Sequence, residues 1–97
     1  MEDRVRIDKW LWHARFYRTR VMAQSAASAG SIRINGQRVE RASLYVGTGD
    51  ILTLPQGNRV VVVRVLGVAK RRSSAPEARR LYEILPENSL DREGRAS

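Results

Sequence analysis

The dipeptide Asn35-Gly36 constrains the fold more than any other feature of this 97-residue chain. It separates two short β-prone segments, residues 32–34 and 37–39, and an Asn-Gly pair in that setting is typical of a tight β-hairpin. A two-residue loop places Arg33 opposite Arg38, and like charges that face each other in a sheet are mildly destabilising. Either both side chains splay into water or an anionic ligand lies between them, and this pair alone leaves both alternatives open.

Two helices are predicted before the hairpin. The first spans about Lys9–Phe16, with Asp8 as its N-cap, because a carboxylate can accept amide protons of the first turn. The second spans about Arg20–Ala29, with Thr19 as its N-cap and Gly30 as the residue that ends it. Small side chains on one side of the second helix predict that the two helices pack closely: Ala23, Ala26 and Ala27.

The first helix has two apolar sides. One is a stripe with helical spacing, which we expect in the core: Ile7, Trp10, Leu11, Ala14 and Tyr17. Trp12 and Phe16 lie on another side, where we expect core packing that meets the C-terminal segment or a partner, with base stacking as the alternative. His13, the only histidine, is expected at the surface.

The second half of the chain predicts strands and a C-terminal helix. Ile51–Leu54 reads as a short strand and Pro55–Asn58 as a turn, whereas Arg59–Leu66 is a strand because its valines are β-branched. Residues 74–77, Ser-Ala-Pro-Glu, fit a capping box with proline in the first turn, so a helix is expected as far as Leu85.

The predicted fold class is therefore α+β, with two packed N-terminal helices, a small mostly antiparallel sheet and a C-terminal helix. We expect a single domain over residues 4–86, with its core motif at 7–54. Residues 87–97 contain little apolar surface and are expected to be a disordered tail.

The charge balance favours a polyanionic ligand. The net charge is +8, with 18 basic against 10 acidic residues, and sixteen of the basic residues are arginine. Six basic residues and no acidic one lie between Lys9 and Arg38, and a further basic run is found at residues 70–72. A planar guanidinium can fork onto a phosphate and stack on a base, so nucleic acid is the expected partner.

Little in the sequence supports catalysis. The chain has no cysteine, hence no disulfide or thiolate metal site, and no second histidine at metal-ligand spacing. It has no phosphate-binding glycine loop, and Asp8 is interpreted as a helix cap or as the partner that orients an arginine. We expect no enzyme activity, metal or cofactor. The first residues form no apolar segment of signal-peptide length, so we expect a cytoplasmic protein.

Motifs in the first half of the chain resemble the S4-type RNA-binding domain over about residues 4–54. They are Arg6-Ile7-Asp8-Lys9, Arg15, Thr19-Arg20, Ala23, Gly30 and Ile34-Asn35-Gly36. The resemblance implies two packed helices and a hairpin that present one basic surface to RNA. It implies the following RNA contacts: Arg6, Lys9, Arg15, Thr19, Arg20, Gln24, Arg33, Asn35 and Arg38. Asp8 would orient the neighbouring arginines, Arg18 would join the surface at the helix–helix junction, and Gly36 would complete the hairpin tip.

Within this family the chain resembles two branches. Residues 8–12, 14–17 and 56–58 resemble the fifteen-kilodalton heat-shock branch, which binds free large ribosomal subunits that still hold a nascent chain on a transfer RNA. Residues 81–85 also resemble short proteins that act in ribosome-associated quality control, during tailing of stalled chains. Both branches imply ribosomal RNA of the large subunit as the partner. Direct contact with peptidyl-tRNA stays open, and we expect a monomer.

Other functions remain alternatives. The chain could be a generic module for structured RNA, or the non-catalytic partner of an RNA-modifying enzyme, since it has no room for a catalytic domain of its own. A DNA-binding helix-turn-helix protein would not need a hairpin directly after its second helix. A protein-interaction module would use Trp12 and Phe16, and its binding would depend little on salt. Contacts to about six phosphates instead predict a log–log salt slope of roughly −4 to −5.

Overall fold

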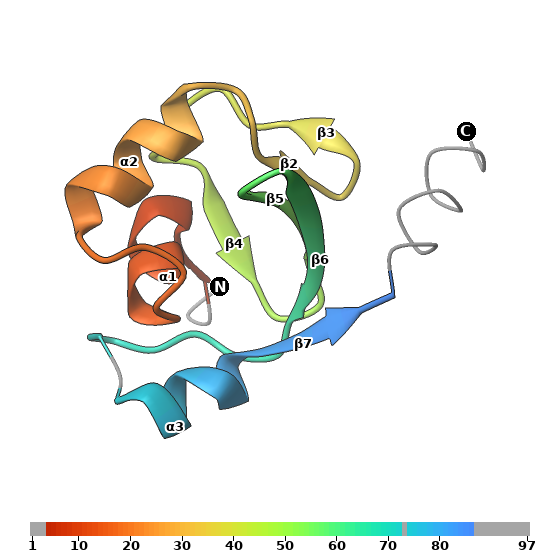
Figure 1. Cartoon of the computed structure of the whole chain (residues 1–97). Helices are drawn as coiled ribbons and strands as arrows, with labels where there is room; N and C mark the ends of the chain where they lie inside the picture. Colours follow the sequence, from red (N-terminus) through yellow and green to blue (C-terminus); the bar gives the residue numbers. More distant parts are fainter. Residues whose placement is uncertain (1–3, 73, 87–97) are drawn as a thin grey trace.

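A computed structural model of the chain describes residues 4–72 and 74–86 (Figure 1). The predicted tail at 87–97 lies outside the described residues. The fold is α+β, as the sequence predicted: Figure 1 shows two N-terminal helices together on one side of the strands, and a short helix where the last strand begins. Within the described residues, no helix is long and apolar enough to cross a membrane.

The two N-terminal helices are α1 (Ile7–His13) and α2 (Arg20–Ser28). Helix α2 begins as predicted, because the Thr19 hydroxyl accepts the Met22 N–H at 3.1 Å. It also ends as predicted, since Gly30 takes the left-handed conformation at φ +83°.

Helix α1 departs from its prediction at both ends. It stops at His13 because Arg15 adopts φ +68° and the Phe16 N–H turns back to the Leu11 carbonyl at 2.9 Å. Asp8 is not its N-cap, because Arg6 holds that position and makes no side-chain cap. The first helical amides instead reach a distant segment: Ile7 N–H bonds the Leu44 carbonyl at 2.6 Å, and Asp8 N–H bonds the Ala42 carbonyl at 3.4 Å.

The main sheet is antiparallel and follows the order β3-β2-β5-β6-β7. Its strands are β2 (Arg33–Ile34), β3 (Gln37–Arg38), β5 (Ile51–Gln56), β6 (Arg59–Val65) and β7 (Tyr82–Leu85). The hairpin has the predicted register, with Arg33 opposite Arg38, and both loop residues lie at positive φ. Strand β5 continues through Pro55 where a turn was expected, because β2 pairs only with its residues 52 and 53 and leaves that edge open for proline.

The predicted C-terminal helix is much shorter than expected. Ser74 caps it by accepting the Glu77 N–H at 3.4 Å, but α3 (Ala75–Ala78) continues only as the 3-10 turn η1 (Arg79–Leu81). Residues 82–85 then form β7, which pairs with β6 from Val62 to Val65. The open edge of the valine-rich strand β6 provides backbone hydrogen-bond partners for residues 82–85, and these bonds outweigh the helix preference that the spacing of the apolar residues indicated.

A second, two-stranded sheet was not predicted. It pairs β1 (Arg4–Arg6) with β4 (Tyr45–Gly47). Because β1 runs directly into α1, this small sheet fixes where Arg6 enters the helix.

The core lies between the helices and the sheet, where α1 supplies the predicted stripe. Its fully buried large side chains include Trp10, Ile7, Leu11, Ile32, Leu52, Leu54, Val39, Val46, Val63 and Val65. Ala23 and Ala27 of α2 are fully buried as well, which confirms the close approach of the two helices. Tyr17 is only partly buried.

Trp12 and Phe16, which lie outside this stripe, also pack against other residues, and both contact the C-terminal segment as expected. The Phe16 ring lies 4.6 Å from the Tyr82 ring and 5.9 Å from the Trp10 ring. Trp12 is partly buried and contacts Arg72. The prediction for His13 was wrong, since its side chain is only 3% exposed.

Candidate nucleic-acid interface

Asp8 is the centre of the basic surface, and its side chain is completely buried. Arg6 binds it through two hydrogen bonds, Nε to Oδ1 at 3.1 Å and Nη2 to Oδ2 at 2.9 Å. The Lys9 N–H donates to Oδ1 at 2.7 Å, and the Arg20 guanidinium approaches Oδ2 at 3.8 Å. A buried carboxylate is tolerated only with such partners, so Asp8 joins β1, α1 and α2 at one point.

The two guanidiniums held by Asp8 also face water. The Arg6 side chain is 32% exposed and that of Arg20 is 41% exposed. An arginine has five N–H donors, so groups remain on each side chain for a ligand. The hydrogen bond to Asp8 raises the pKa of Arg6. The structure thus supports the interpretation of Asp8 as the orienting partner of arginines.

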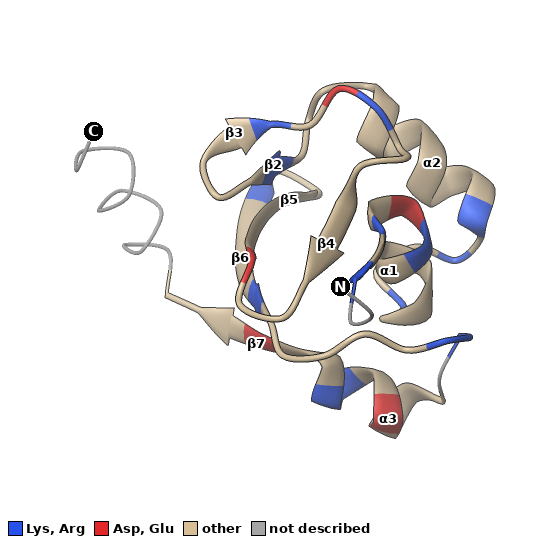
Figure 2. Ribbon diagram, turned by 180° about the vertical axis from the view of Figure 1, so that it is seen from behind, with Lys and Arg blue, Asp and Glu red and all other residues tan. Residues whose placement is uncertain are grey.

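The other predicted residues before the hairpin lie on α2 or in the connection between the two helices. Arg15 and Arg18 are exposed in the connection between the helices, and Gln24 is exposed one turn after Arg20 on α2. Figure 2 shows basic segments on β1, α1 and the start of α2. We call the following set the junction surface: Arg6, Lys9, Arg15, Arg18, Thr19, Arg20 and Gln24. The Thr19 hydroxyl already serves as the α2 cap.

The two hairpin arginines point in different directions. Arg33 Nη1 donates to the Gly36 carbonyl at the hairpin tip, at 3.4 Å. Arg38 instead lies over Gly30, where an added Cβ would stand 2.6 Å from its Nε and Nη2 atoms. This position is close to the C-terminal end of α2, whose dipole favours a cation. The geometry favours the splayed alternative, since no ligand is needed to separate the two charges.

The side chain of Asn35 forms two hydrogen bonds within the protein. Its amide donates to Asp50 Oδ1 at 3.1 Å, and its Oδ1 accepts the Ile51 N–H at 2.9 Å. Asp50 in turn accepts the Gly47 N–H at 2.8 Å. Asp50 was not among the predicted site residues, although its position in a Gly-Asp turn was a signal of side-chain-to-backbone bonding. Gly36 has open space around it.

The pKa of His13 is affected by two cations of the junction surface. Its Nδ1 lies 3.1 Å from the Ala69 carbonyl, which requires a proton on Nδ1. Burial is the main factor that lowers its pKa, and the charges of Lys9 and Arg20 lower it further. His13 is therefore neutral at pH 7 and is a structural residue beneath the basic surface.

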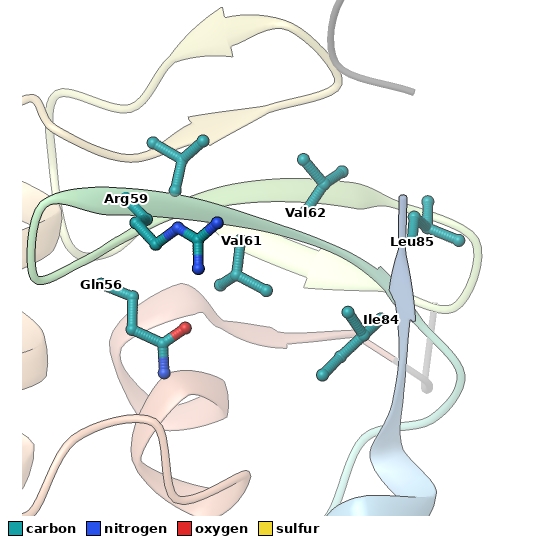
Figure 3. A pocket seen from close by; sticks show the side chains of 7 residues that line it. Gln56, Arg59, Val61, Val62, Ile84 and Leu85 are labelled. Atoms are coloured by element: carbon teal, nitrogen blue, oxygen red, sulfur yellow. The ribbon is translucent and has the colours of Figure 1, made fainter. Parts of the chain in front are cut away.

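The described residues hold no group of three His, Asp or Glu side chains that could bind a metal. A shallow groove of about 430 Å³ lies beside β6 and β7 (Figure 3). It is lined by Gln56, Arg59, Val60, Val61, Val62, Ile84 and Leu85. Its walls are mostly aliphatic.

Known proteins resemble this chain in sequence and structure. Residues 5–52 match the family described as S4 domain. The chain is 42% identical over 82 residues to a heat shock protein 15 homolog of Haemophilus influenzae, an alignment that covers 84% of this chain and 62% of that protein. It is 37% identical over 86 residues to the RQC P-site tRNA stabilizing factor of Bacillus subtilis, covering 89% of this chain and 98% of the relative.

A solved structure also shares the fold. The trimeric structure of Vibrio cholerae heat shock protein 15 is 37% identical, with a TM-score of 0.81, and the match covers 98% of this chain and 94% of that one. Among the heat shock relatives matched by sequence, such as that of Haemophilus influenzae, the chain spans only about three fifths of the relative's length.

Proposed function

Since the chain belongs to the S4-domain family that includes heat shock protein 15 and the RQC P-site tRNA stabilizing factors, we propose that it binds ribosomal RNA of the large ribosomal subunit. The membership confirms the resemblance drawn from the sequence. The observation that carries the proposal is the buried Asp8 carboxylate, which holds Arg6 and directs Arg20 from a different element.

Fixed guanidiniums suit an RNA backbone. Each can fork onto a phosphate, and a side chain already held in place loses less conformational entropy when it binds. The deep major groove of A-form RNA excludes side chains, so recognition would depend on shape, phosphates and 2′-hydroxyls. In this proposal the domain over residues 4–86 acts by binding alone, without catalysis.

The names of the relatives suggest which subunits are bound. One group is named for heat shock and another for stabilising a P-site tRNA. We therefore propose that the preferred target is a large subunit that still carries peptidyl-tRNA, in rescue or in ribosome-associated quality control. A ribosomal target would place the protein in the cytoplasm.

Co-sedimentation tests this proposal. The purified protein is mixed with empty large subunits or with large subunits carrying peptidyl-tRNA, over a series of salt concentrations. Preference for the loaded subunit, lost as salt rises, is the expected result. Equal weak binding to all particles would leave a generic RNA-binding module, and competition by duplex DNA would indicate the DNA-binding alternative. Binding that does not change with salt concentration would indicate a protein-interaction module.

The oligomeric state needs its own measurement, because the Vibrio cholerae relative is described as a trimer. We propose that the chain binds as a monomer, since β1, α1 and α2 of one chain supply the whole junction surface. Light scattering at the protein concentrations used for binding tests this, and the mass of a trimer would contradict it.

A further inference from the structure

The loop formed by residues 66–72 lies beyond the part of the chain that matches the S4 domain, yet it is bonded closely to α1. Three hydrogen bonds connect the two segments: Trp10 Nε1 to the Gly67 carbonyl at 2.9 Å, His13 Nδ1 to the Ala69 carbonyl at 3.1 Å, and Arg72 Nε to the Trp12 carbonyl at 3.3 Å. Since hydrogen bonds hold Gly67, Ala69 and Arg72 separately against α1, the 66–72 loop is fixed against this helix at three points.

Arg72 has an internal role in this arrangement. Besides its hydrogen bond to the Trp12 carbonyl, its guanidinium lies 5.8 Å from the centre of the Trp12 ring. A cation over an indole face is attracted by the ring, and Arg72 is partly buried there. The third residue of the basic run therefore fastens the loop instead of facing outward.

Lys70 and Arg71 remain exposed, and neither has an ion-pair partner among the residues that the structure describes. The loop is bonded to Trp12 and His13, the last residues of α1, so it lies at the end of the helix from which the connection with Arg15 and Arg18 of the junction surface starts. Figure 2 shows the basic tip of this loop and the basic start of α2 on the same side of the molecule. Two uncompensated cations are thus held beside an already positive surface.

We propose that Lys70 and Arg71 form a second phosphate-binding element, which contacts an RNA segment next to the one bound by the junction surface. This inference rests on the proposed function and extends it to residues outside the S4 match. The bonds between the loop and α1 fix the element before binding, which lowers the conformational cost of the contact.

A double substitution tests the element by its effect on salt dependence. Lys70→Ala/Arg71→Ala removes two phosphate contacts, so the log–log salt slope for loaded large subunits should become shallower by about 1.5, with affinity about tenfold lower at low salt. The control is Arg59→Ala/Arg64→Ala on β6, which removes the same formal charge away from the junction surface, although Arg64 is already paired with Glu83. It should bind much like the parent.

Each outcome has a separate meaning. If Lys70→Ala/Arg71→Ala had the same salt slope as the parent, this inference would be overturned. The proposed function would still stand, as long as the parent itself binds in a salt-dependent way. An equal loss of affinity in both double variants would mean that net charge alone explains the effect, which would also overturn the inference. A loss seen with subunits but absent with protein-free ribosomal RNA would assign the loop to a ribosomal protein. Failure of the parent to bind would remove the proposed function itself.

A charge-conserving variant tests the internal role of Arg72. Arg72→Lys keeps the charge but loses the Nε–H donor and the planar stack on Trp12. We expect weaker binding with an unchanged circular dichroism spectrum, whereas Lys70→Arg should bind like the parent. Parent-like affinity in Arg72→Lys would show that a fixed loop is not required.

Discussion

Arg6 and the buried carboxylate of Asp8 are joined by two parallel hydrogen bonds, 3.1 and 2.9 Å long. The pair spans the boundary between β1 and α1, and the same carboxylate lies 3.8 Å from Arg20 of α2. Removing its negative charge should therefore affect both the fold and the direction of two cations.

Asp8→Asn tests this relationship because it keeps the shape of the side chain and removes its charge. We expect a loss of about 2 kcal/mol in the free energy of unfolding, less than for a fully buried pair because Arg6 is partly exposed. RNA affinity should also fall, although the net charge of the protein becomes more positive. Urea unfolding and RNA titration measure the two effects.

The control for Asp8→Asn is Glu83→Gln, which removes an equal charge from the exposed pair with Arg64. Little change in stability is expected there. If both variants bound RNA more tightly than the parent, net charge would explain binding and the orienting role of Asp8 would be wrong.

Arg20→Glu should weaken RNA binding more than tenfold, because it replaces a cation of the junction surface with an anion that repels phosphate. The side chain is 41% exposed, and Arg6 and the Lys9 N–H keep their closer bonds to Asp8, so the fold should survive the change. Arg59→Glu on β6 makes the same charge change elsewhere. Equal affinities of the two variants in the same titration would contradict the site assignment.

Gly30→Ala should reduce both stability and RNA affinity. Its φ of +83° strains any residue with a Cβ, at a cost of about 1 kcal/mol, and the new Cβ would displace the Arg38 guanidinium. Gly49→Ala offers a matched control, since Gly49 has φ +98° but open space around it. Both variants should lose thermal stability, whereas only Gly30→Ala should lose RNA affinity. Equal RNA affinities would show that the position of Arg38 is unimportant for binding.

Asn35→Gly should destabilise the protein even though glycine accepts the positive φ of this position. It removes the bonds to Asp50 and Ile51, which together contribute about 1–2 kcal/mol. A double-mutant cycle with Asp50→Ala measures the coupling by chemical denaturation. Additive losses would mean that the two side chains act independently.

Stability should fall as the pH drops below the ordinary pKa of histidine, near 6.5. Burial holds the pKa of His13 below that value in the folded state, so the unfolded chain binds more protons and acid favours unfolding. His13→Gln keeps an N–H donor for the Ala69 carbonyl and cannot titrate. Between about pH 7 and 5, its melting temperature should fall less than that of the parent. Parallel curves would exclude His13 as the cause.

The candidate surface was only partly predictable. Basic residues at the junction follow from the resemblance and lie together in the structure, but the sequence did not reveal that Asn35 bonds internally or that Arg38 folds over Gly30. Arg72 and Trp12 were noticed separately, and their contact joins residues sixty positions apart. Such pairings depend on where two distant segments meet, which short-range patterns do not contain.

The sequence by itself determined the features that a few neighbouring residues decide. Thr19 and Ser74 cap helices, and Asn35-Gly36 closes the hairpin in its predicted register, because each satisfies backbone groups within three residues. The tertiary structure alone decided the strand at residues 82–85, the burial of His13 and which of its two predicted roles Asp8 takes. In each case the decisive partner is distant in sequence: the open edge of β6, the Ala69 carbonyl, and the carbonyls of Ala42 and Leu44 that replaced a helix cap.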